Sequence, residues 1–105
     1  MEIDYSLLSK NANILIVDDT VANLTLLSQM LKNCGYHTRP VPNGRLALQA
    51  ANGDKPDLVL LDITMPDMDG YEVCTRLKQD PKLKDIPVLF ISALTQTSEK
   101  LKAFE

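Results

Sequence analysis

Aspartates stand directly behind two apolar runs of this chain. Asp18 and Asp19 follow residues 13–17 (NILIV), and Asp62 follows residues 58–61 (LVLL). Short apolar runs of this kind are typical of strands that are buried on both faces of a parallel sheet. Because ligands of such sheets bind beyond the carboxyl ends of the strands, neighbouring strands would bring all three carboxylates into one crevice.

Three carboxylates held together repel one another unless a cation lies among them. No cysteine or histidine stands near them in the sequence, and a ligand set made only of oxygen suits Mg²⁺. A magnesium ion beside a carboxylate is a site for phosphoryl transfer, with Asp62 as the expected nucleophile. Taken singly, Asp19 is also explained as a helix cap and Asp62 as a turn residue. Those explanations do not account for the clustering of the acids.

The composition excludes several classes of function. A length of 105 residues supports one domain, and its 14 acidic and 11 basic residues are scattered, which leaves no basic surface for nucleic acid. The longest apolar runs are far shorter than the ~20 residues that span a bilayer, and residues 1–12 lack the pattern of a signal peptide. We therefore expect a cytoplasmic protein that contacts neither membrane nor nucleic acid directly. Cys34 and Cys74 are expected to be free thiols.

A helix is predicted between the first two strands. It begins after Asp19 or Thr20, either of which could cap it, and Gly35 ends it. The predicted core face of this helix consists of Leu24, Leu27, Leu31 and Cys34. Residues 37–41 form the predicted second strand.

Further helices are predicted after each later strand. One opens at Asn43 and one at Asp69, where Glu72 three residues on resembles a capping box. A last helix is expected after residues 88–91, which form the fourth strand. The predicted core face of the helix that opens at Asn43 consists of Leu46, Ala47, Ala50 and Ala51. That of the helix that opens at Asp69 consists of Val73 and Leu77, and that of the last helix consists of Leu101 and Phe104. Strands that alternate with helices over short connections predict an α/β, doubly wound parallel sheet with helices on both faces.

The acidic motifs carry a resemblance to a known family. The chain resembles the response-regulator receiver domain, the CheY-like module, in three motifs. These are the two aspartates after the first strand, D-x-x-M-P-x-M-D-G from Asp62 to Gly70, and Ser92 with Ala93 after the fourth strand. The resemblance covers nearly all of residues 13–105, so we expect residues 1–12 to be an N-terminal leader. It implies a CheY/flavodoxin-like sheet with strand order 2-1-3-4-5.

The resemblance also implies roles for individual residues. Asp62 would accept a phosphoryl group from a sensor histidine kinase or a phosphotransfer protein. Asp19 would coordinate Mg²⁺ directly and Asp18 mainly through water, together with Asp62 and the backbone carbonyl of Thr64. Ser92 would sense the phosphoryl group. The residues implied to shape the loop after the acceptor are Met65, Pro66 and Gly70.

The sequence departs from the family at its end. The family has a fifth strand that ends in a lysine, followed by a fifth helix, and no residue here matches that lysine. Lys100 and Lys102 fall on the predicted fourth helix and are not assigned its role. We therefore expect a receiver domain, residues 13–105, that lacks the last strand and helix. An uncovered edge at residues 88–91 would then allow a partner chain, a homodimer or an exchange of elements to complete the sheet.

Three other functions are compatible with parts of the sequence. An EF-hand calcium loop placed on Gly70 would need ligands at Met65 and Arg76, which cannot supply them. An aspartate-based phosphatase of the haloacid-dehalogenase kind needs an acid two residues after its nucleophile, where this chain has Thr20. A non-phosphorylatable docking module with a receiver-like fold stays open, because the lysine is absent. We expect a signalling domain that acts on an output domain or partner protein and is not itself an enzyme.

Overall fold

The computed structural model describes residues 11–91 and shows strands and helices in strict alternation. The elements are β1 (Asn13–Val17), α1 (Val21–Asn33), β2 (His37–Val41), α2 (Gly44–Gly53), β3 (Leu58–Asp62), α3 (Gly70–Gln79) and β4 (Val88–Ile91). The strands form one parallel sheet in the order β2-β1-β3-β4. This is the doubly wound parallel sheet expected from the sequence. The predicted fourth helix lies outside the described residues.

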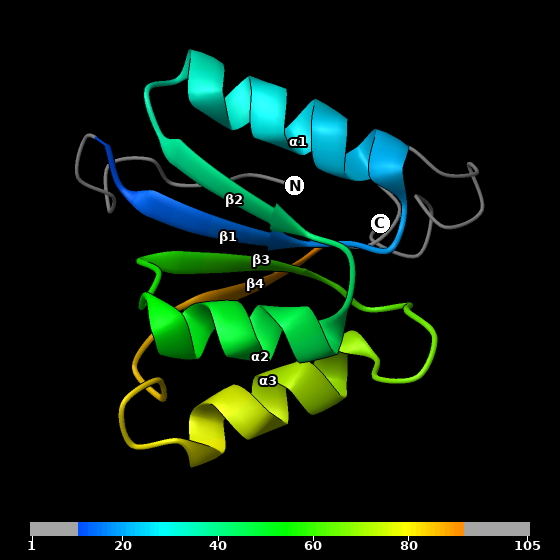
Figure 1. Ribbon diagram of the computed structural model, residues 1–105, viewed down its shortest axis with the longest axis vertical. Helices are drawn as coiled ribbons and strands as arrows, with labels where there is room; N and C mark the ends of the chain where they lie inside the picture. The colour runs from blue at the N-terminus through cyan, green and yellow to red at the C-terminus, as the bar shows by residue number, and fades with distance from the viewer. Residues whose placement is uncertain (1–10, 92–105) are drawn as a thin grey trace.

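Helices cover both faces of the sheet. Helix α1 lies against one face, and α2 and α3 lie side by side against the other (Figure 1). Side chains along β1 and β3 alternate between the two layers, as the period of two in a strand requires. Those on the α1 side are Ile14, Ile16, Leu58 and Leu60, and those on the α2 and α3 side are Leu15, Val17, Val59 and Leu61. Each of these side chains is buried, and burial of one such side chain stabilises the fold by about 1.5–3 kcal/mol. The two central strands therefore contribute much of the hydrophobic stabilisation.

The helices α2 and α3 begin at side-chain caps. The Asn43 carboxamide oxygen accepts from the Leu46 backbone N–H at 2.9 Å, and the Asp69 carboxylate accepts from the Glu72 backbone N–H at 2.9 Å. Each cap satisfies an N–H group that has no partner inside the helix. The Glu72 carboxylate pairs with Arg76 at 2.8 Å. The Asp69 half of the predicted capping box is therefore present.

Two residues assigned to the core by their spacing are exposed. Cys34 is exposed and lies at the C-cap of α1, one residue past the end of the helix, and Gly35, with a φ of +95°, then turns the chain toward β2. Leu46 is 40% exposed, because α2 turns Gly44 and the alanines toward the core instead. A Cβ atom on Gly44 would lie 2.5 Å from a methyl group of Val73, so the two helices are in close contact there. Those two assignments were wrong.

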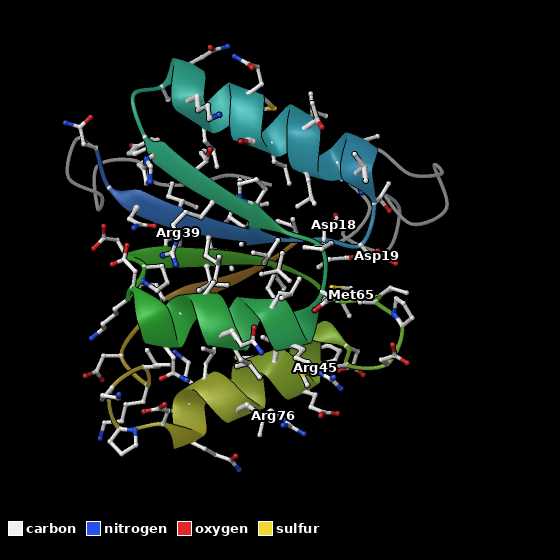
Figure 2. The ribbon with its side chains drawn as sticks, viewed as in Figure 1. Asp18, Asp19, Arg39, Arg45, Met65 and Arg76 are labelled. Carbon is white, nitrogen blue, oxygen red and sulfur yellow. The ribbon has the colours of Figure 1, made fainter. Side chains whose placement is uncertain are left out.

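Arg39 fastens the amino-terminal end of the sheet to α2. Its guanidinium donates to the backbone carbonyls of Ala50 at 2.6 Å and Asp54 at 2.7 Å, and to the side-chain oxygen of Asn13 at 3.2 Å. The Ala50 carbonyl also accepts from the Asp54 backbone N–H at 3.0 Å, so the guanidinium adds to a backbone bond already present at the end of α2. Figure 2 shows Arg39 far from Asp18 and Asp19, which leaves the carboxyl ends of the strands for the acidic residues.

Gly70 lies where α3 meets the end of β3. Its backbone N–H donates to the Ile63 carbonyl at 2.9 Å. A Cβ atom at this position would lie 2.9 Å from the Cα atom of Ile63 and closer still to the carbonyl oxygen of Asp62. Only glycine lets the helix begin this close to the strand.

Substitution of Gly70→Ala should lower the free energy of unfolding by about 2 kcal/mol, because the added methyl group overpacks against backbone atoms that cannot move independently. Urea denaturation followed by circular dichroism would measure this. Gly53→Ala is the matched control, since a Cβ atom there meets no heavy atom within 4 Å. It should leave stability unchanged or raise it by up to about 1 kcal/mol. Equal losses in the two variants would contradict this account of Gly70.

Candidate functional site

Carboxylates gather at the carboxyl ends of the two central strands. Asp18 and Asp19 follow β1, and Asp62 is the last residue of β3. Val17 lies in register with Leu61, so the residues that follow emerge at the same edge of the sheet. One oxygen atom from each of the three carboxylates lies within 4.8 Å of the others. Figure 2 shows Asp18 and Asp19 together beyond the end of β1.

The same local hydrogen bond orients two of these carboxylates. The Asp18 carboxylate accepts from the backbone N–H of Thr20 at 2.9 Å, and the Asp62 carboxylate accepts from that of Thr64 at 3.3 Å. Such a bond to the residue two positions on is characteristic of aspartate in turns. Asp18 and Asp62 are each 2% exposed, whereas Asp19 faces solvent. The cluster is therefore buried on one side and reached by water from the other.

The charges of this cluster call for a cation. Two unit charges about 5 Å apart repel by about 3 kcal/mol at an effective dielectric constant of about 20. This repulsion applies most directly to the buried pair, Asp18 and Asp62. Hydrogen bonds from two backbone N–H groups offset part of this cost. The donor set of three carboxylates, without sulfur or imidazole, fits Mg²⁺, which binds through a few carboxylates and keeps several waters.

The loop between β3 and α3 forms one wall of the site. Met65 is 7% exposed and belongs to the core beneath α2 and α3, so it anchors the loop. The backbone N–H of Met68 donates to the Pro66 carbonyl at 2.8 Å, and Asp67 has a φ of +68°. Thr64 is exposed beside Asp62. The turn is held tightly at both ends while its polar residues face water.

Some of the predicted site residues cannot be placed. Ser92, Lys100 and Lys102 lie outside the described residues. Within residues 11–91, β4 pairs with β3 alone, so an uncovered edge at β4 stays a prediction. The leader at residues 1–12 and the incomplete C-terminal end of the domain stay predictions as well.

Asn23 belongs to the site, and the sequence analysis missed it. This residue is 3% exposed, and its carboxamide donates to the second oxygen of Asp18 at 3.0 Å. One signal could have revealed it. Asn23, Leu27 and Leu31 are spaced four apart, so Asn23 lies on the core-facing stripe of α1, where a polar side chain needs a buried partner.

The comparisons with known proteins agree with this geometry. A family model for the response regulator receiver domain matches residues 14–105. The chain belongs to this family. A solved structure, the N-terminal domain of a response regulator receiver protein from Methanoculleus marisnigri JR1, aligns with a TM-score of 0.77 and 41% identity over 89% of this chain and 76% of that one.

Two curated relatives of this receiver domain are much longer proteins. Response regulator PleD of Caulobacter vibrioides is 42% identical over 95 residues, which are 90% of this chain and 21% of PleD. A probable cyclic di-GMP phosphodiesterase of Vibrio cholerae is 39% identical over 88% of this chain and 21% of its own length. The chain therefore spans about a fifth of these two relatives. In the part that the structure describes, no helix is both long and apolar enough to cross a membrane.

Substitution of Asp19→Asn should stabilise the cation-free receiver domain. Removing one of three crowded charges should add about 1 kcal/mol, which corresponds to a rise of about 5 °C in the unfolding midpoint. The further rise caused by Mg²⁺ should shrink at the same time, because the ion loses a ligand. Thermal unfolding at low ionic strength, with and without Mg²⁺, would measure both effects. Asp67→Asn is the matched control, and equal changes in the two variants would contradict the proposed cation site.

Proposed function

We propose that this receiver domain is the phosphoacceptor of a two-component system, which takes a phosphoryl group onto Asp62 with the help of Mg²⁺. The observation that carries the proposal is the approach of oxygens from Asp18, Asp19 and Asp62 to within 4.8 Å, at the edge of the sheet where α/β folds bind ligands. Membership of the receiver family supports it. The proposed donor is a sensor histidine kinase or a phosphotransfer protein.

Asp62 is suited to act as the nucleophile. The Thr64 N–H orients its carboxylate, and the side chain is 2% exposed, so its orientation is fixed by the surrounding protein. A carboxylate oxygen forms a bond to phosphorus while the bond between phosphorus and the donor's imidazole nitrogen breaks. The electron pair of that bond returns to the imidazole. The product is an acyl phosphate on Asp62 and an unmodified histidine on the donor.

Four groups would hold the magnesium ion. Asp19, Asp62 and the Thr64 carbonyl would bind it directly, and Asp18 would bind it mainly through water. When bound, the ion supplies positive charge that neutralises the phosphoryl oxygens as they approach the carboxylates. Met65, Pro66 and Gly70 keep the loop in place around these groups. Ser92 would respond to the new phosphoryl oxygens as the switch residue.

The consequence of phosphorylation is a changed binding surface. The phosphoryl group adds close to two negative charges at one point, which alters the contacts of the strand ends and of the loop. That change would be transmitted to an output domain or a partner protein, as the greater length of the relatives suggests. The β4 edge is the proposed place for a homodimer or an exchange of elements. We place this signalling domain in the cytoplasm and assign it no catalytic turnover of its own.

A docking module that does not phosphorylate is the alternative function. The acidic cluster argues against it, because three carboxylates without a cation destabilise the fold and do nothing for a surface that only docks. The uptake of a phosphoryl group separates the two functions.

Incubation of the chain with Mg²⁺ and a small acyl-phosphate donor should increase its intact mass by one phosphoryl group. Chelation of the metal should prevent the increase, and so should Asp62→Asn, while Asp67→Asn should leave it unchanged. Mass spectrometry of the intact protein would measure the gain. No gain in a chain shown by circular dichroism to be folded would support the docking module instead.

A further inference from the structure

We infer that Asn23 is a positioning residue for the metal site, where it fixes the carboxylate of Asp18 in the orientation that a divalent cation requires. The inference rests on the proposed function, since it assigns a residue to the same site. Asn23 contributes no charge and is not proposed to touch the ion. It acts through Asp18.

Both oxygens of the Asp18 carboxylate accept hydrogen bonds from the start of α1. One carboxylate oxygen accepts from the Thr20 N–H at 2.9 Å, and the other accepts from the Asn23 carboxamide at 3.0 Å. Both oxygens of a carboxylate that is 2% exposed are therefore held by protein donors. A carboxylate offers about four lone-pair positions, so room remains for a cation or for a water bound to it. The two bonds stop the carboxylate from rotating away from Asp19 and Asp62.

Position 23 suits asparagine better than other residue types. The side chain must be a donor, because it faces a carboxylate, and it must be neutral at a site that already holds three negative charges. It must also be short, since Asn23 is the third residue of α1 and is 3% exposed. Asparagine meets all three conditions. An aspartate would instead place a fourth negative charge beside Asp18.

The same contacts join the metal site to the start of α1. Thr20 occupies the N-cap of this helix, but its side chain makes no capping bond. The Asp18 carboxylate accepts hydrogen bonds from the Thr20 N–H and the Asn23 carboxamide. These bonds connect the start of α1 to a proposed metal ligand. Hydrogen-bond donors that contact a metal-binding carboxylate orient it, and their loss typically weakens metal binding by about 10–100-fold.

The test measures divalent-cation binding directly, with Mn²⁺ as the probe because it takes the same oxygen ligands as Mg²⁺. Free Mn²⁺ is followed by its electron paramagnetic resonance signal while protein is added. Asn23→Leu, which has the same branching and the same number of side-chain heavy atoms but no donor, should raise the Mn²⁺ dissociation constant at least about 10-fold. Ser28→Ala is the matched control. Ser28 is a buried residue of the same helix, and its hydroxyl bonds to that of Thr38 at 2.7 Å, so its loss should leave Mn²⁺ binding unchanged.

Thermal unfolding of an Asn23→Asp variant, with and without Ca²⁺, gives a second test whose expected result would not arise from loss of packing alone. The cation-free protein should unfold at a lower temperature than the unaltered chain, and saturating Ca²⁺ should raise its midpoint by more, because a fourth carboxylate both repels the others and adds a ligand. Unchanged Mn²⁺ affinity in a folded Asn23→Leu variant, or an equal Ca²⁺ response in Asn23→Asp and the unaltered chain, would overturn the role of Asn23. Failure of the unaltered chain to bind Mn²⁺ would overturn the metal site itself, and the inference with it.

Discussion

The parallel pairing of β1 with β3 determines where the acidic residues of the site meet. These strands lie at the centre of the sheet, in parallel and in register, so the residues that follow them emerge at the same place although they are more than forty positions apart in the chain. Their side chains are apolar on both faces because a helical layer covers each face. That burial stabilises a fold that must also hold carboxylates against their mutual repulsion. The acidic cluster is a consequence of strand order.

The two ends of the sheet carry different tasks. At the amino-terminal end, the Arg39 guanidinium donates to carbonyls at the end of α2, so polar groups there complete the fold. At the carboxyl end, backbone N–H groups and the Asn23 carboxamide hold Asp18 and Asp62 in place. These donors are neutral, so they orient the carboxylates without neutralising them. The cluster thus keeps the negative charge that attracts a cation, and a bound cation would assist phosphoryl transfer.

Much of this arrangement could be predicted from the sequence, because strong local signals agreed with the tertiary structure. The strands at residues 37–41 and 88–91 have the bounds that their patterns indicated, and Asp69 caps α3 as its position before Glu72 suggested. The failures have a common cause. Leu46 and Cys34 were assigned by periodicity alone, which does not show where a helix ends or which turn faces a neighbouring helix. Asn23 was missed because its importance comes from a contact that only the folded chain reveals.

Chemical identification of the phosphorylated residue tests the role of Asp62 as phosphoacceptor. After treatment of the chain with Mg²⁺ and an acyl-phosphate donor, borohydride reduces an aspartyl phosphate to homoserine, and peptide mass spectrometry locates the homoserine. The account predicts homoserine at position 62 and nowhere else among the acids of the cluster. Homoserine at position 18 or 19, with Asp62 intact, would contradict it.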